Sequence, residues 1–516
     1  MFRIGIDVGG TNTDAVIMKD RVVMKSCKTP TTEDVMRGVL NALNNILEKS
    51  GVNRESINSV MIGTTHFTNA VIQRRGLSKT GCVRLGLPAT ASLVPMVDWP
   101  EDLREVLGNN YALAHGGYEF DGRKISEMDS DELKKIAEDF AKKDISSVAI
   151  SAVFSPVNTE MEHKAKEVLE KELTDAHFTL SSDIGRIGLL ERENAAIMNA
   201  CIRDLSEKTI NAFKEALIQA GLNSKFYLTQ NDGTLMSEEH ARKYPVLTFA
   251  SGPTNSMRGA AFLSGLKDAI VIDIGGTTTD VGALHKGFPR QASIAVEIGG
   301  VRTNFRMPDV FSIGLGGGSK VINEDGNIKI GPQSVGYRLT EDALIFGGDI
   351  LTASDIAVAA GMADFGDTTK ITRDSLRFVN QAVNRIQEML SIAAERMRLS
   401  SEPIPVIVVG GGSILALDQI GELPVERPEN HAVANAVGAA IAQISGEIDR
   451  VYSLAELSRD KVLEKSKEEA EAKAVEAGAK KETIKIVDVE DVPLAYLPGN
   501  ATRVRVKAVG DLDDTS

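Results

Sequence analysis

The chain has 516 residues, of which 42% are hydrophobic and 25% charged, the composition of a globular protein long enough for two large lobes. Its formal net charge of −14 argues against nucleic acid and anionic membrane surfaces as partners, because both attract a basic protein face. No apolar run reaches the length of a membrane span and the chain begins directly in an expected strand, so we predict a cytoplasmic protein without signal peptide or membrane partner.

Residues 2–76 predict a β-β-β-α-β order. Apolar runs bounded by turn residues indicate strands at 2–8, 14–19, 21–27 and 59–65. A helix is expected from the capping pattern Thr31-Thr32-Glu33-Asp34 to about Lys49, because apolar residues recur there at helical spacing. A second helix over 69–76 has arginines and a glycine at its end, a common way for helices to stop.

Residues 80–130 are richer in glycine and proline and less periodic, and we expect an insertion at about 80–145. His115 lies here beside two glycines and is either a cleft acid/base or a turn residue; His66 has the same two interpretations. The periodicity then predicts helices 129–143 and 159–172 and strands 147–154 and 177–181. An Ala-rich helix over 192–202 either connects two lobes or is an ordinary buried helix.

The second half again alternates helices and strands. The expected elements are helix 205–220, strand 225–230, a small-residue helix after Ser251-Gly252-Pro253, a long helix over 373–399 and strand 404–409. Residues 430–440 predict another small-residue helix, suited to connecting two lobes.

Composition divides the chain into three expected parts. We predict an N-terminal lobe over 1–200, with an insertion at about 80–145, and a C-terminal lobe over 201–450. In the third part, 451–516, a segment packed with Lys, Glu and Ala predicts a charged helix, followed by a short β tail. That helix is either a plain surface helix or a partner-binding one.

Two stretches share one pattern, IGIDVGGTNTDAVI at 4–17 and VIDIGGTTTDVGAL at 271–284. Each has an apolar run, an Asp, a Gly-Gly pair, hydroxyl residues, a second Asp and another apolar run, which predicts strand, tight turn and strand. One such hairpin is weak evidence for a binding site, because Gly-Gly turns beside Asp also occur as purely structural turns. Two copies separated by about half the chain indicate a duplication.

The two turns have the chemistry of a phosphate clamp. Glycines let the backbone approach a bulky anion, successive N–H groups form an anion-binding nest, and threonine hydroxyls donate to phosphate oxygens. An Asp repels phosphate, so Asp7 and Asp273 make sense if Mg²⁺ lies between the carboxylates and the phosphates. We therefore predict Asp7 and Asp273 as catalytic and metal-binding residues. The predicted phosphate-binding residues are Gly9, Gly10, Thr11, Asn12, Thr13, Gly275, Gly276, Thr277 and Thr278.

These hairpins resemble the phosphate loops of the actin, sugar-kinase and heat-shock ATPase superfamily. Gly410, Gly411 and Gly412 follow an apolar run and fit the superfamily's adenosine motif, although a structural strand-to-helix turn is the alternative. The resemblance implies an α/β protein with the two-lobed actin-like ATPase fold, built from duplicated ribonuclease-H-like domains, with ATP in the interlobe cleft. The glycine run 316–318 is either a further backbone-approach site or a flexible loop.

The first hairpin also resembles the DVGGTFTD opening of the hydantoinase A / 5-oxoprolinase family, except that Asn12 stands where that family commonly has an aromatic residue. Nearly all of the chain shares this resemblance. The matching pieces include Gly63-Thr64-Thr65, Asn69-Ala70, Arg74-Arg75-Gly76, His115-Gly116-Gly117, Phe120-Asp121-Gly122, Ser251-Gly252-Pro253, Gly316-Gly317-Gly318-Ser319 and the tail 493–500. The tail is the most family-specific piece, because general actin-like ATPases lack it.

The family resemblance implies an ATP-dependent hydrolase subunit that uses ATP and Mg²⁺ to phosphorylate the amide oxygen of a cyclic amide such as a hydantoin, 5-oxoproline or a lactam. A separate B-type subunit, for which this chain has no matching stretch, would complete the ring opening. Related subunits also occur in ATP-dependent ketone carboxylases.

Other interpretations stay open at this stage. A small-molecule kinase or an actin-like nucleotide switch would use the same two hairpins. Covalent hydrolysis is not supported, because the chain has no nucleophile elbow, Ser-His-Asp order or Cys-His pattern. Cys27, Cys82 and Cys201 are far apart, which fits a reducing cytosol rather than a disulfide framework or a zinc finger.

Overall fold

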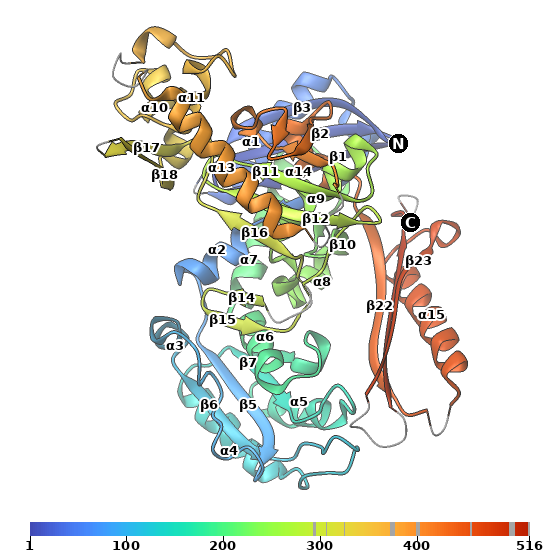
Figure 1. Ribbon diagram of the computed structural model, residues 1–516. Helices are drawn as coiled ribbons and strands as arrows, with labels where there is room; N and C mark the ends of the chain where they lie inside the picture. The colour runs from blue at the N-terminus through green and yellow to red at the C-terminus, as the bar shows by residue number, and fades with distance from the viewer. Residues whose placement is uncertain are drawn as a thin grey trace.

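The computed structural model describes residues 1–32, 34–292, 296–305, 307–324, 326–371, 377–398, 403–454, 457–494 and 501–513. They form a nine-stranded sheet, a seven-stranded sheet, a four-stranded parallel sheet and two small hairpins (Figure 1). Residues 495–500 of the predicted tail, Glu33 of the capping pattern and both ends of the predicted helix 373–399 lie outside the described residues.

The first repeat forms one end of the nine-stranded sheet, in the spatial order β3-β2-β1-β4. Its strands are β1 (Phe2–Val8), β2 (Asn12–Lys19), β3 (Val22–Pro30) and β4 (Ile57–Thr64). β1 pairs antiparallel with β2 and parallel with β4, and α1 (Val35–Ser50) packs across β2 and β3. Asp34 caps α1 by accepting hydrogen bonds from the backbone N–H groups of Met36 and Arg37. The predicted β-β-β-α-β order is confirmed.

The same sheet continues from β4 with strands from distant parts of the chain. These are β9 (Lys225–Thr229), β10 (Thr234–Ser237), β22 (Gln443–Tyr452), β24 (Thr502–Gly510) and β23 (Lys485–Pro493). Helix α15 (Arg459–Glu476), formed by the charged segment, buries Val462, Ala470 and Ala474 and packs against β22 and β24. The C-terminal strands therefore belong to the sheet of the first repeat.

A separate four-stranded parallel sheet is inserted after β4 and α2 (His66–Gln73), in the order β6-β5-β7-β8. Its strands are β5 (Thr80–Leu87), β6 (Asn110–His115), β7 (Ser147–Ala152) and β8 (His177–Leu180), with helices α3 (Glu101–Leu107), α4 (Ser130–Lys142) and α5 (Glu160–Glu172). The sheet thus reaches beyond the stretch 80–145 that composition alone indicates. The Ala-rich helix α6 (Leu189–Cys201) packs mainly against β7, and α7 (Arg203–Gln219) and α8 (Glu238–Lys243) follow.

The second repeat builds the seven-stranded sheet. β11 (Ala269–Ile274) pairs antiparallel with β12 (Thr279–His285) and parallel with β19 (Val406–Val409), as β1 does with β2 and β4. Around this core lie β13 (Phe288–Pro289), β14 (Val296–Ile298), β15 (Val301–Thr303), β16 (Val310–Ile313), β17 (Ser319–Glu324), β18 (Asn327–Ser334), α10 (Leu339–Asp342), α11 (Ala353–Ala359), α13 (Val379–Met397), β20 (Gln419–Ile420) and β21 (Leu423–Glu426). The duplication predicted from the hairpins is confirmed.

Two helices, α9 (Ser251–Ser264) and α14 (Ala434–Ala440), pack together where the two repeats meet (Figure 1). α14 packs on β1, β2 and β4, whereas α9 contacts β11, β12 and β19 as well as β4. The helices approach closely: a Cβ on Gly438 would lie 1.8 Å from the carbonyl oxygen of Asn255, and one on Gly259 would lie 1.8 Å from that of Ala434. Glycine is therefore required at both positions.

Candidate functional site

The two predicted hairpin turns face each other and touch. In each turn the first glycine donates its N–H to a carbonyl three residues on, Gly9 to Asn12 at 3.1 Å and Gly275 to Thr278 at 2.9 Å. A Cβ on Gly276 would lie 3.0 Å from the Thr11 hydroxyl. The equivalent turns of the two repeats therefore meet as opposite jaws of one site.

Asp7 is the next-to-last residue of β1, beside the first turn, and is buried, with 4% of its surface exposed. Asn255 of α9 donates to its Oδ1 atom at 3.1 Å, and Asn435 of α14 donates to its Oδ2 atom at 3.1 Å. The pKa of Asp7 is raised to about 6, mainly by burial; the hydrogen bonds from Asn255 and Asn435 oppose this shift, and the nearby charges of Asp14 and Asp273 add to it. The carboxylate is thus held in place by two amides, and no cationic side chain in the described part of the chain forms an ion pair with it.

Asp273 occupies the equivalent position on β11. The Ser256 hydroxyl donates to its Oδ2 atom at 2.5 Å. Withdrawal from solvent raises the pKa of Asp273, opposed by the Ser256 bond and the charge of Lys28. A Cβ on Gly410 would lie 2.2 Å from the Oδ1 atom, so the predicted adenosine loop lies directly against this carboxylate.

Each aspartate has a second aspartate opposite it across its hairpin, Asp14 for Asp7 and Asp280 for Asp273. Asn435 donates to Asp14 Oδ2 at 2.9 Å, and Lys28 Nζ lies 2.6 Å from Asp14 Oδ1. Asp280 accepts a hydrogen bond from the Ser312 hydroxyl, and burial raises its pKa to about 6. The repeats are alike in fold but differ in how their second carboxylates are paired.

The glycine run 316–318 braces the second turn. Gly317 donates its N–H to the Gly275 carbonyl at 3.0 Å, and Gly318 donates to the Gly276 carbonyl at 2.7 Å. A Cβ on Gly316 would lie 2.6 Å from the Gly276 carbonyl carbon. Of the two interpretations, close backbone approach is therefore the one that holds, with the turn itself as the approached group.

The predicted site residues do not all face the meeting point of the turns. Thr13 is fully buried, and its hydroxyl lies 3.3 Å from that of Thr31, which donates to the Gly9 carbonyl at 2.8 Å. His115 ends β6 of the inserted sheet and is exposed, and its Nδ1 lies 3.1 Å from Glu132 of α4. His66 begins α2 directly after β4, where burial lowers its pKa.

Four side chains at the site were missed by sequence reasoning: Lys28, Asn255, Ser256 and Asn435. The two amides and the serine lie on small-residue helices whose composition indicates close packing rather than their polar contacts. Lys28 lies on β3, directly opposite Asp14. Its Nζ lies 3.7 Å from the position of a Cβ on Gly411, between the first hairpin and the predicted adenosine loop.

The site fits Mg²⁺ shared with phosphates better than a protein-only metal cage. Within the described ranges no group of three or more His, Cys, Asp or Glu side chains is arranged to hold a metal ion. Mg²⁺ usually takes one or two carboxylates and completes its shell with water and phosphate oxygens. Asp7, which is buried, and Asp273, which is partly buried, lie beside two glycine turns and supply such a set.

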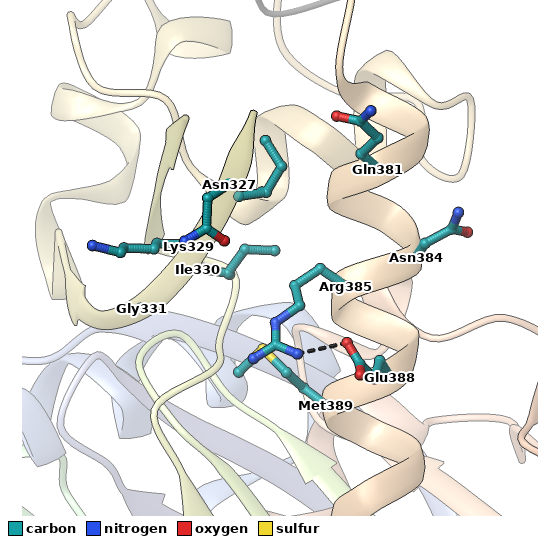
Figure 2. A pocket seen from close by; sticks show the side chains of 10 residues that line it. Asn327, Lys329, Ile330, Gly331, Gln381, Asn384, Arg385, Glu388 and Met389 are labelled. Carbon is teal, nitrogen blue, oxygen red and sulfur yellow. Dashed lines mark hydrogen bonds and ion pairs between the residues drawn. The ribbon is translucent and has the colours of Figure 1, made fainter. Parts of the chain in front are cut away.

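A groove of about 920 Å³ lies elsewhere, between β18 and α13 (Figure 2). Its lining includes Lys329, Gln381 and Asn384, and an ion pair between Arg385 and Glu388 at 2.5 Å. None of the predicted site residues lines it, so the meeting point of the hairpins is the stronger candidate site.

The helices of the described residues include no candidate membrane span. None combines the length and the apolar character that crossing a bilayer requires.

Comparison with known proteins identifies relatives of this chain. Models of the hydantoinase/oxoprolinase N-terminal region and of hydantoinase/oxoprolinase match residues 3–173 and 192–373. An uncharacterised protein of Methanocaldococcus jannaschii is 24% identical over 99% of this chain and 83% of its own length. Caprolactamase subunit alpha of Pseudomonas jessenii is 26% identical over 85% of this chain and 65% of its own length. The acetophenone carboxylase gamma subunit of Aromatoleum aromaticum is 25% identical over 69% of this chain and 53% of its own length.

The chain thus spans less than two thirds of the length of these two enzyme subunits. A solved structure, the ATP-dependent caprolactamase from Pseudomonas jessenii, superposes with a TM-score of 0.79 at 18% identity, covering 99% of this chain and 88% of that one. The chain therefore belongs to the hydantoinase/oxoprolinase family and has the two-lobed actin-like ATPase fold expected from its duplicated hairpins.

Proposed function

We propose that the chain is the ATP-using subunit of a cyclic-amide hydrolase of the hydantoinase/5-oxoprolinase type. The observation that carries the proposal is that two equivalent hairpins meet. The first strand of each carries an aspartate beside its Gly-Gly turn, the buried Asp7 in one and the partly buried Asp273 in the other. Such a pair suits a triphosphate gripped from both sides. The similarity to caprolactamase subunit alpha supports a lactam or a related ring as the acceptor.

In this proposal each feature of the site has a stated task. Asp7 and Asp273 would hold Mg²⁺, which supplies charge neutralisation at the transferring phosphoryl group when bound. The backbone N–H groups of the Gly9–Gly10 and Gly275–Gly276 turns would donate to phosphate oxygens. Lys28 would add a positive charge between the first hairpin and residues 410–412, where the adenosine would lie.

The proposed phosphorylation activates an amide carbonyl, which is a poor electrophile. An amide carbonyl is stabilised by resonance, so water attacks it slowly. Transfer of the γ-phosphoryl group to the amide oxygen forms the O–P bond, breaks the bond to ADP and leaves a carbon that water can attack. Closure of the two lobes around the turns, once the acceptor is bound, would exclude water from the γ-phosphate during transfer.

A partner subunit and a cytoplasmic location are part of the proposal. Both similar enzymes are described as subunits, and a B-type partner would complete hydrolysis after phosphorylation. The chain's three cysteines are all free and buried, in keeping with a reducing compartment.

A second candidate function is a subunit of a ketone carboxylase. The similarity to the acetophenone carboxylase gamma subunit favours it. There the phosphoryl acceptor would be an enol oxygen rather than an amide oxygen, and the same hairpins would serve. A stable phosphorylated product would instead indicate a small-molecule kinase, and ATP binding without any acceptor would indicate a nucleotide switch.

The test is ADP release by the purified protein with Mg²⁺-ATP against hydantoins, 5-oxoproline, lactams and ketones, with and without a candidate B-type partner. We expect one class of ring compound to stimulate ADP release, and ring opening to require the partner. If ketones in the presence of bicarbonate are the only compounds that stimulate ADP release, the ketone carboxylase function would be favoured. Tight ATP binding without stimulation by any compound would contradict both enzyme proposals.

A further inference from the structure

Helix α9 presents two consecutive side chains to the two aspartates of the candidate site. Asn255 donates to Asp7 Oδ1 at 3.1 Å, and Ser256 donates to Asp273 Oδ2 at 2.5 Å. The aspartates belong to different sheets, because Asp7 is on β1 and Asp273 on β11. Two consecutive residues of one helix therefore contact both hairpins of the site.

The Ser256 hydroxyl donates outside its own helix, unlike most serine hydroxyls within helices. Serine hydroxyls inside helices commonly donate to the carbonyl four residues earlier. Ser264, on the same helix, does so with Ala260 at 2.8 Å. Ser256 is 2% exposed and donates across to the second sheet instead.

Asn255 is likewise committed to the site rather than to its own helix. It is fully buried, and its Nδ2 group donates to Asp7 and, at 3.0 Å, to the Thr229 hydroxyl. Its Oδ1 atom has no hydrogen-bond partner among the described residues. Burying an unpaired acceptor disfavours folding. Stability alone therefore does not explain why an asparagine stands at position 255.

α9 is anchored on both sides of the site, so it can act as a rigid spacer. At its start the Ser251 hydroxyl donates to the Thr64 carbonyl at 3.2 Å, at the end of β4. Further on, Arg258 donates to the Gly287 carbonyl at 2.7 Å, beyond β12 of the second sheet. The close crossing with α14 at Gly438, opposite the backbone of Asn255, prevents α9 from sliding without a clash.

We infer that Asn255 and Ser256 are positioning residues that set the separation and orientation of Asp7 and Asp273, so that both carboxylates reach one Mg²⁺-ATP. Asn435 assists from α14 by holding the second oxygen of Asp7. The inference rests on the proposed function in one respect, that Mg²⁺-ATP is the ligand of the two aspartates. It adds a prediction for residues that act through the two aspartates.

The test measures equilibrium binding of ATP by the full-length protein as a function of Mg²⁺ concentration, with binding of metal-free ATP in EDTA as a parallel series. The variants are Ser256→Ala, Asn255→Ala and the double variant. Ser264→Ala is the matched control, because it removes a hydroxyl from the same helix away from the site. Thermal unfolding of each variant without nucleotide reports any general loss of structure.

We expect each single variant to raise the Mg²⁺ concentration for half-maximal ATP binding by about 10-fold or more, the usual effect of removing a group that orients a metal ligand. Binding of metal-free ATP should stay within about twofold, and Ser264→Ala should match the unchanged protein. In the double variant the loss should be smaller than the product of the single losses, because releasing either carboxylate already breaks the shared grip.

Ser256→Ala decides the test even if Asn255→Ala folds poorly, since it removes one hydroxyl and adds no bulk. Unchanged Mg²⁺ dependence in Ser256→Ala, or an equal loss with and without Mg²⁺, would overturn the inference and leave the proposed function standing. Absence of any Mg²⁺ dependence in the unchanged protein would overturn the proposed function, and this inference with it.

Discussion

Gly276 of the second hairpin lies so close to Thr11 of the first that an added Cβ would meet three atoms of the threonine side chain at 3.0 to 3.3 Å. Gly10, at the equivalent place in the first hairpin, has open space within 4 Å of its Cβ position. The two Gly-Gly turns are therefore unequal in the described conformation. Glycine at position 276 of the second turn lets this turn contact Thr11 of the first turn.

This contact predicts the effect of Gly276→Ala on stability. The added methyl overpacks the contact with Thr11, and we expect a loss of about 1–2 kcal/mol in the free energy of unfolding without nucleotide. The matched variant Gly10→Ala should change it by less than about 0.5 kcal/mol. Denaturant unfolding of both variants is the measurement. Equal effects of the two substitutions would contradict the closed contact between the turns.

Lys28 predicts a loss of nucleotide affinity. Lys28→Met removes the positive charge between Asp14 and the 410–412 loop, so we expect the KM for ATP to rise on the order of 10-fold, with a smaller change in kcat. Lys25→Met is the control, because Lys25 lies on the same strand and is exposed. Steady-state kinetics over a range of ATP concentrations measure both. A change in kcat alone would argue against a role in binding ATP.

Asp280 predicts a pH-dependent stability difference. Its folded pKa of about 6 exceeds the ordinary value of 3.8, so its stabilising contribution is present below about pH 4 and is lost as pH rises through 6. Asp280→Asn keeps a neutral side chain at every pH. The unfolding free energy of the variant, minus that of the unchanged protein, should therefore increase between pH 4 and pH 7.

Denaturant unfolding at several pH values without nucleotide measures this difference. Asp268→Asn serves as the control, because Asp268 is exposed just before the same hairpin, where its carboxylate lies 3.2 Å from His285 Nδ1. A difference for Asp280→Asn that is constant with pH would show that burial does not disfavour its charge.

Local pattern predicted much of the fold and of the candidate site. The spacing of apolar residues around each Gly-Gly pair specifies strand, turn and strand, and the two copies alone singled out Asp7 and Asp273 as candidate site residues. The helix Val35–Ser50 was equally readable, because both its cap and its apolar periodicity are local. These features depend on residues that are neighbours in the chain.

The missed features depend on contacts between distant segments. Asn255 meets Asp7 across 248 positions of sequence, and Asn435 meets it across 428. Nothing in a run of small residues shows which amide will face a carboxylate. Likewise, Gly438 signals close approach only once its neighbour, the backbone of Asn255, is known. The lobe limits drawn from composition stay a prediction. Strands β22 to β24 lie in the same sheet as β1 to β4, although they are far from them in the sequence.

The central claim is that Asp7 and Asp273 act together on ATP for transfer to a small acceptor. Its most direct test is acceptor-stimulated ADP release by the unchanged protein, Asp7→Asn and Asp273→Asn, each with the B-type partner present. The account predicts that both variants keep the fold by circular dichroism and lose stimulated ADP release by at least about 100-fold, because each removes a charge that holds the metal. Turnover retained in either variant at the level of the unchanged protein would contradict the paired-hairpin site.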